Sequence, residues 1–164
     1  MSEAGELQVV VFALGDEQFA LPVGEVREIL DHRAPYRVPN APAWLLGLTD
    51  VRGVSVPVID LRLRLGLAPV AVTSTTRVLV VEVTLPERGA IMTLGLTVDR
   101  VFDVRGYAAA AVEPPPELGV RWHAEHLRGV LRRGDGFAIL LDLPSIFSAD
   151  AEAELLVDTA DEGG

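Results

Sequence analysis

The sequence contains no cysteine and no lysine, and only 5% of its 164 residues are aromatic. Without cysteine the chain has no disulfide framework, no thiolate nucleophile and no sulfur ligand for a metal ion. All 14 basic residues are arginine, and 24 acidic residues bring the formal net charge to −10. Nucleic-acid binding requires a concentrated basic surface, so the composition disfavours that class of function.

Long apolar runs are absent as well, although 49% of the residues are hydrophobic. Polar residues, glycine or proline interrupt every apolar run well short of a membrane span. The N-terminus lacks the layout of a signal peptide, so we expect a cytoplasmic protein. The length predicts one domain, or two small lobes that share a core.

The acidic excess is concentrated at the two ends of the chain. Six acidic residues and no basic residue follow Phe147, whereas the body of the chain is close to neutral. We therefore predict a flexible N-terminus at residues 1–6, a folded domain at residues 7–148 and an acidic tail at residues 149–164. The tail composition is typical of disorder, and we expect folding and function to survive without it.

Three apolar residues interrupt the polar composition of the tail, and they leave a second interpretation open. Leu155, Leu156 and Val157 are consecutive, and they could dock on the body as part of a helix.

What the chain does contain is an internal repeat. The segment GLTDVRGVSVPVIDL starts at Gly47, and GVLRRGDGFAILLDL starts 82 residues later at Gly129. Upstream, FALPVGEVREI from Phe19 overlays LGLTVDRVFDV from Leu94. A unit that occurs twice indicates a fold built by doubling one small module. Two modules side by side form a groove with two outer flanks, a shape that suits a connector.

Short apolar runs bounded by turn residues predict β-strands in both repeats. Hairpins are expected at 9–23 and 47–60, with the second turn at Arg52-Gly53, and a third hairpin is expected near residue 134. Further strands are expected at 76–83 and 91–98. Such short, evenly spaced strands point to small antiparallel barrels, one for each repeat.

Other segments are predicted to lie outside the strands. Val23, Val26 and Leu30 recur at helical spacing, which predicts a helical turn before Asp31. Prolines in 33–44 and 114–116 cannot donate ladder hydrogen bonds and predict extended connectors. One helical turn is also expected at 122–127.

Patterns that indicate catalysis are scarce. His123 and His126 are three residues apart, but no cysteine and no third histidine accompany them, which disfavours a metal site. Asp60 and Asp142 follow apolar strands, where a catalytic carboxylate could lie, yet helix capping explains both. No nucleophile elbow, phosphate loop or zinc-protease motif is present. We predict no enzyme activity, no catalytic residue, no cofactor and no metal.

A partner-binding cleft is the alternative use of the repeated module. If the two lobes pack side by side, the strands that end in Val23/Val26 and Val98/Val101 can line a shared apolar cleft. Helix-in-groove recognition uses such a floor. The competing interpretation is that Val26 and Val101 are ordinary core residues.

Five ordered motifs give the chain a family resemblance. They are F-x-L-G-D-E-x-F-A-L-P-V-x-x-V-x-E-I from Phe12, V-P-N-A-P from Val38 with G-x-x-x-x-R-G-x-x-x-P-V-x-D-L from Gly47, V-D-x-V from Val98, P-P-P-E from Pro114, and G-D-G-x-x-I-L-L-D-L from Gly134. Over about residues 7–147, the sequence resembles the CheW-like chemotaxis coupling family.

The resemblance implies an all-β fold of two intertwined five-stranded SH3-like barrels with short helices. It also implies a non-catalytic adaptor that couples a CheA-type histidine kinase to the cytoplasmic hairpin tips of chemoreceptors. Glu28, Thr49 and Arg52 match family positions near the receptor cleft. Glu117 and Leu118 are candidates for contact with the regulatory domain of the kinase in rings, although Leu118 could instead plug its own barrel.

The same resemblance implies a protein that is monomeric when isolated, does not insert into the membrane and is recruited to membrane-associated receptor arrays. One motif departs from the family, which usually has Asn-Leu-Arg-Gly where this chain has Asp50-Val51-Arg52-Gly53. The added carboxylate could partly neutralise Arg52 and alter partner choice. The alternative functions are an adaptor of the same build in a pilus-motility or other non-flagellar array, and a purely structural array subunit.

Overall fold

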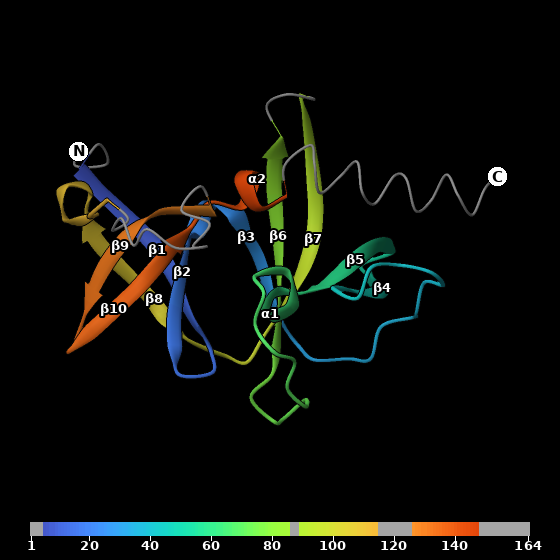
Figure 1. Ribbon diagram of the computed structural model, residues 1–164. Coiled ribbons are helices and arrows are strands. Elements are labelled where there is room, and N and C mark those ends of the chain that lie inside the picture. Colours follow the sequence, from blue (N-terminus) through green and yellow to red (C-terminus); the bar gives the residue numbers. More distant parts are fainter. Residues whose placement is uncertain (1–4, 86–88, 115–125, 148–164) are drawn as a thin grey trace.

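A computed structural model describes residues 5–85, 89–114 and 126–147 (Figure 1). In chain order the regular elements are β1 (Glu6–Leu14), β2 (Glu17–Pro22), a 3₁₀ turn (Val23–Glu25), β3 (Val26–Asp31), β4 (Leu45–Val51), β5 (Val54–Asp60), α1 (Leu61–Arg64), β6 (Arg77–Leu85), β7 (Ala90–Val98), β8 (Arg100–Ala108), a second 3₁₀ turn (Ala109–Ala111), β9 (Leu127–Arg133), β10 (Gly136–Leu141) and α2 (Leu143–Ile146).

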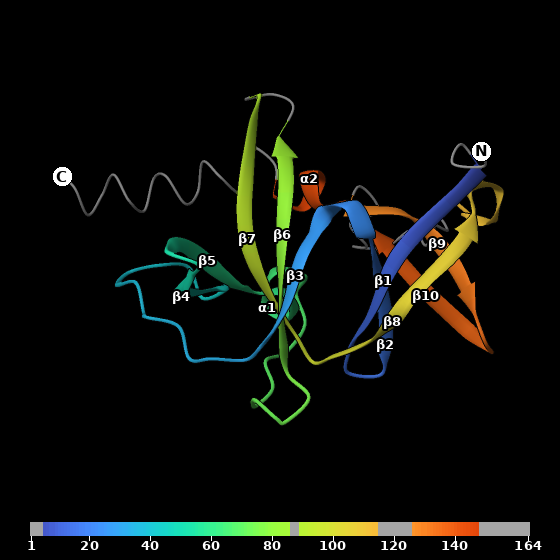
Figure 2. The ribbon, with the colours of Figure 1, turned by 180° about the vertical axis from the view of Figure 1, so that it is seen from behind.

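The strands form two five-stranded sheets, which Figures 1 and 2 show as two separate curled bodies. One sheet, called lobe A, has the order β8-β1-β2-β10-β9, and the other, called lobe B, has the order β3-β6-β7-β5-β4. In each lobe one inner pair is parallel, β2 with β10 and β5 with β7, and the other pairs are antiparallel. The predicted all-β fold of two five-stranded units is confirmed.

The two sequence repeats do not each form one lobe, because they exchange strands. Lobe A combines β1 and β2 of the first repeat with β8, β9 and β10 of the second, and lobe B combines β6 and β7 with β3, β4 and β5. Strands β1 to β5 of the first repeat correspond in order to β6 to β10 of the second. When each strand in lobe A is replaced by its counterpart, the strand order becomes that of lobe B. The chain therefore crosses between the lobes twice, after β2 and after β7.

Most predicted strands are present, but the segment before Asp31 and the segment after Val98 differ from the expectation. The helical spacing of Val23, Val26 and Leu30 produces only the three-residue 3₁₀ turn, because Val26–Asp31 pairs with β6 as strand β3. Strand β8 was not predicted at all. Of the helical turn expected at 122–127, residues 122–125 lie outside the described residues, and Leu127 starts β9.

The repeated glycines at 47 and 129 are explained by two equivalent backbone crossings. The first connector bridges β4 where Tyr36 pairs with Leu48, and the second bridges β9 where Glu113 pairs with Val130. A Cβ atom on Gly47 would lie 2.1 Å from the carbonyl oxygen of Tyr36, and one on Gly129 would lie 2.8 Å from that of Glu113. Each repeat therefore needs a residue without a side chain where its connector crosses the sheet.

The main hydrophobic core belongs to both lobes at once. It joins Phe12 and Leu14 of β1 to Leu79 of β6, Leu96 of β7 and Leu143 of α2, all of them at most 2% exposed. A smaller cluster fills the interior of lobe A around Val11 and Leu131. Because the larger core is shared, burial of apolar surface opposes separation of the lobes.

Candidate functional site

Arg52 lies at the tip of the hairpin that joins β4 to β5. The tight turn places Arg52 at φ 54° and Gly53 at φ 84°. Two-residue hairpin turns favour such left-handed conformations at both positions, but the side chain of arginine makes this conformation costly. Such turns usually have glycine, asparagine or aspartate at the position that Arg52 occupies. Residues held in an unfavourable backbone conformation concentrate at functional sites.

The Arg52 side chain reaches β3 and binds Glu28 with two hydrogen bonds. Its Nε donates to Oε2 of Glu28 at 2.8 Å, and its Nη2 donates to Oε1 at 3.2 Å. Hydrogen bonding from Arg52 lowers the pKa of Glu28, and the same hydrogen bond raises the pKa of Arg52. Since β3 and β4 are the two outer strands of lobe B, this ion pair spans the seam where the curled sheet meets itself.

Lobe A has an equivalent ion pair at the equivalent seam. Asp103 on β8 occupies the place of Glu28, and Arg133 at the end of β9 contacts it at 3.3 Å. The Arg133 side chain is only 17% exposed, whereas that of Arg52 is 79% exposed. Both pairs join the outer edges of their sheets, but only Arg52 also presents a large free surface to a partner.

Thr49 and Asp50 lie on β4 beside this pair. Thr49 is half-buried, whereas Asp50 is exposed and has no hydrogen bond or ion pair among the residues that the structure describes. The carboxylate that binds Arg52 is therefore that of Glu28. Val54, next to the turn, is 58% exposed, and sequence reasoning missed this apolar surface.

The four valines of the predicted cleft have different environments. Val98 has no exposed surface and belongs to the main core. Val26 and Val101 are half-buried and pack against the same core. Val23 lies in the 3₁₀ turn between the lobes and is 40% exposed. The sequence repeat predicts that these four valines lie near one another. It does not predict which face of the sheet each side chain occupies.

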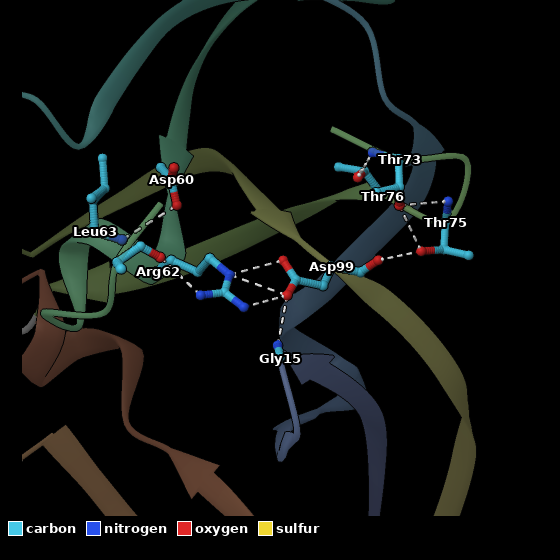
Figure 3. A network of polar contacts seen from close by, with 9 residues as sticks. Gly15, Asp60, Arg62, Leu63, Thr73, Thr75, Thr76 and Asp99 are labelled. Carbon is cyan, nitrogen blue, oxygen red and sulfur yellow. Dashed lines mark hydrogen bonds and ion pairs between the residues drawn. The ribbon is translucent and has the colours of Figure 1, made fainter. Parts of the chain in front are cut away.

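A polar network holds the crossover from lobe B back to lobe A (Figure 3). Asp99, between β7 and β8, accepts hydrogen bonds from Nη2 of Arg62 at 2.7 Å and from the backbone N–H of Gly15 at 2.6 Å. Nε of Arg62 lies 3.1 Å from both carboxylate oxygens. Burial raises the pKa of Asp99, but the hydrogen bonds from Arg62 and Gly15 outweigh it and lower the pKa below the usual value.

The other crossover also carries a carboxylate and an arginine. Glu25, in the 3₁₀ turn after β2, lies 3.5 Å from Nη2 of Arg128, which lies 3.6 Å from Asp142. Burial raises the pKa of Glu25 despite the opposing effect of Arg128. Ion pairs thus hold the chain at both points where it passes from one lobe to the other. Sequence reasoning missed both clusters, since their members are far apart in the chain.

The residues considered for catalysis have structural roles where they are described. Asp60 accepts a hydrogen bond from Leu63 N at 3.3 Å, so its predicted cap of α1 is confirmed. The predicted side-chain cap is wrong for Asp142, because its side chain contacts Arg128 and its backbone oxygen receives the helix N–H groups. In 5–85, 89–114 and 126–147 no group of three or more His, Asp or Glu could hold a metal ion.

Several predicted residues lie beyond what the structure describes. Glu117 and Leu118, the candidates for kinase contact, fall in 115–125, as does His123, and the tail follows Phe147. In the described part of the chain, no helix combines the length and the apolar composition that a membrane span requires.

Comparison with known proteins places this architecture in a family. The model of the CheW-like domain matches residues 8–151. The chain is 31% identical to a probable chemotaxis protein CheW of Rhizobium etli, with 92% of each chain covered. It is 32% identical to chemotaxis protein CheW of Klebsiella aerogenes, covering 92% of this chain and 86% of that one.

A solved structure is similar over most of its length too. The scaffolding protein TtCheW of Thermoanaerobacter tengcongensis superposes with a TM-score of 0.76 at 28% sequence identity. The match covers 86% of this chain and 87% of that protein.

Proposed function

The chain belongs to the CheW-like domain family, and from this membership we propose that it is a chemotaxis adaptor that couples a CheA-type histidine kinase to chemoreceptors. The observation that carries the proposal is the match of the family model from residue 8 to residue 151, which spans both lobes. The relatives named above are chemotaxis proteins, and the similar structure is a scaffolding protein. These names favour chemotaxis over a pilus-motility array or a purely structural subunit.

An adaptor of this kind acts by holding partners rather than by catalysis. We propose that residues 7–148 are the functional unit, that the protein works in the cytoplasm at membrane-associated receptor arrays, and that it is a monomer when isolated. A pull-down of the full chain, and of a chain truncated after Phe147, from the native cytosol tests this proposal. Recovery of a histidine kinase and a receptor by both forms supports it, and recovery of a metabolic enzyme without either would overturn it.

The receptor surface is proposed at the open side of lobe B. Arg52 is its centre, because it combines a bidentate pair with Glu28 and a side chain that is 79% exposed. Arginine is frequent at binding hot spots, where its planar guanidinium engages carboxylates or carbonyl groups. Val26 on β3 and Val101 on β8 of lobe A, each half-buried against the shared core, are the proposed apolar contacts.

Substitution of Arg52 tests this surface. Arg52→Ala removes an exposed ion pair, so the melting temperature should change little, while receptor binding should weaken roughly tenfold. Arg105→Ala is the matched control, since Arg105 is also exposed and paired with a carboxylate, but lies on lobe A. Equal receptor binding by the Arg52 and Arg105 variants, and by the unmodified protein, would remove Arg52 from the site.

The kinase surface is proposed at Glu117 and Leu118. The adaptor must hold two partners at once, so the two surfaces cannot overlap. Leu118→Ser should weaken kinase binding and leave receptor binding intact, with the two affinities measured separately on purified proteins. Equal loss of both affinities together with a lower melting temperature would instead place Leu118 in the core of its barrel.

A further inference from the structure

A cavity of about 760 Å³ lies under the proline-rich connector between β3 and β4. Its walls are residues of the connector from His32 to Ala43, Leu45 and Leu46 of β4, and Val72 from the loop before β6. Prolines at 35, 39 and 42 keep the connector extended, so the apolar space beneath it stays open. Val72 is 56% exposed at its mouth.

The titratable side chains that line this cavity are basic. His32 and Arg37 line it, Arg33 lies between them in the connector, and no acidic residue contributes to the walls. Within the described residues, none of these three side chains has an ion-pair partner. An apolar floor with unpaired basic groups at its border fits a segment that combines aliphatic side chains with carboxylates.

Phe147, the last described residue before such a segment, lies near the start of β4. Phe147 ends α2, and its ring centroid lies 5.8 Å from the guanidinium carbon of Arg64. The same guanidinium carbon lies 5.3 Å from the ring centroid of Trp44, which directly precedes Leu45 of the cavity wall. Arg64 also donates a hydrogen bond to the carbonyl oxygen of Ile146 at 2.7 Å. The contacts of Arg64 therefore hold Phe147, the residue that precedes 148–164, near Trp44.

The sequence of 148–164 has the required composition. It contains six acidic residues, no basic residue and the apolar run Leu155–Val157. Seventeen residues can extend up to about 55 Å. The cavity wall includes Leu45, the residue after Trp44, so the segment is long enough to reach it. Because this segment is covalently attached, its effective concentration at the cavity is of millimolar order, so even a weak affinity keeps it bound.

We propose that the acidic segment 148–164 is the ligand of the connector cavity in its own chain. Leu155, Leu156 and Val157 fill the apolar floor, and the flanking carboxylates face His32, Arg33 and Arg37. The segment is not needed for folding, since the shared core is complete without it. This proposal does not depend on the identity of the adaptor's partners.

The first test compares backbone amide NMR spectra of the full chain and of a chain truncated after Phe147. Truncation should move the amide signals of residues 33–46 and Val72, and should leave those of β8 and β9 unchanged. The shifts should not depend on protein concentration. Identical spectra at 33–46 would overturn the proposal, and concentration-dependent shifts would replace it with binding between two copies.

The second test adds a synthetic peptide of residues 148–164 to the truncated chain. The peptide should bind, and Arg37→Glu should weaken binding about fivefold, the upper value of one exposed ion pair. Arg105→Glu, on lobe A, is the control and should have no effect. Higher salt should weaken binding too, because the contacts are exposed charges. No binding, or equal loss with both variants, would overturn the assignment to this cavity.

Discussion

The network around Asp99 gives a quantitative prediction about how the two lobes are held together. Asp99→Asn keeps the shape of the side chain and removes the charge that Arg62 and the N–H of Gly15 share. The Arg62 side chain is 13% exposed and would lose its partner charge in a poorly hydrated place. Removal of one partner from a charge-assisted, partly buried pair costs about 2–3 kcal/mol. Because Asp99 remains 26% exposed, we expect about 2 kcal/mol.

Thermal unfolding measures this loss directly. For a chain of this size about 2 kcal/mol lowers the melting temperature by roughly 4–8 °C. Asp31→Asn is the control, since Asp31 forms a longer pair with Arg77 at 3.6 Å and its side chain is 93% exposed. A double-mutant cycle with Arg62→Met isolates the coupling between the two side chains. Equal effects of Asp99→Asn and Asp31→Asn, or no coupling in the cycle, would refute the assignment of this network as an inter-lobe contact.

The pH dependence of the same comparison has a definite sign. The folded-state pKa of Asp99 is lowered from its ordinary value of 3.8, so the folded protein holds the ionised form more strongly than the unfolded chain does. The stability that this group contributes is therefore complete above the unfolded pKa and is lost as the pH falls through the lowered folded pKa. The unfolding free energies of the wild-type chain and Asp99→Asn should differ at pH 7 and converge in that acid range.

Three further outcomes are expected from the fold. Gly47→Ala should abolish or severely destabilise folding, because its Cβ would lie 2.1 Å from Tyr36 O at φ 148°. Gly129→Ala should be milder in denaturant titrations, because Gly129 has no positive φ and its shortest contact, at 2.5 Å, is with a side-chain atom, Cγ1 of Val112, while Glu113 O lies at 2.8 Å. Val26→Asp should lower the melting temperature as well as receptor affinity, because Val26 packs against the main core; unchanged stability with lost binding would make it purely a contact residue. The isolated first repeat, residues 1–75, should not form a stable monomer by circular dichroism and size exclusion, since neither sheet is complete without the other repeat.

The sequence predicted local elements better than their pairing. Apolar runs and turn residues identified the hairpins and the strands around Leu79 and Leu96, since these signals lie within a few neighbouring residues. Strand β8 was missed because Arg100–Ala108 mixes charged and apolar residues and has only half-buried or exposed side chains. The repeat predicted two units, but strand exchange depends on the pairing of β1 with β8, which lie about 90 residues apart and leave no short-range pattern.

The candidate site was predictable in part for the same reason. Arg52 at a hairpin turn and Glu28 were identified from the motifs they occupy, while the strand that carries Glu28 and the contact between the two side chains were not. The burial of Val98 could not be predicted, because period-two alternation does not say which face is buried when a strand, here β7, has neighbours on both sides. The network of Arg62 and Asp99 had no sequence signal, since an arginine in a short helix and an aspartate in a crossover are usually solvent-exposed.

Strand exchange and the two crossover clusters together bear on how an adaptor of this build works. Each lobe contains strands from both repeats, so neither can rotate freely without breaking sheet hydrogen bonds or opening the shared core. Glu25 with Arg128 at one crossover, and Asp99 with Arg62 at the other, fix the chain where it passes between lobes. The proposed receptor surface on lobe B is thus part of one rigid frame that includes lobe A. A scaffold that holds its partners in a fixed relative orientation requires this rigidity, whereas two independent barrels on a flexible linker would not provide it.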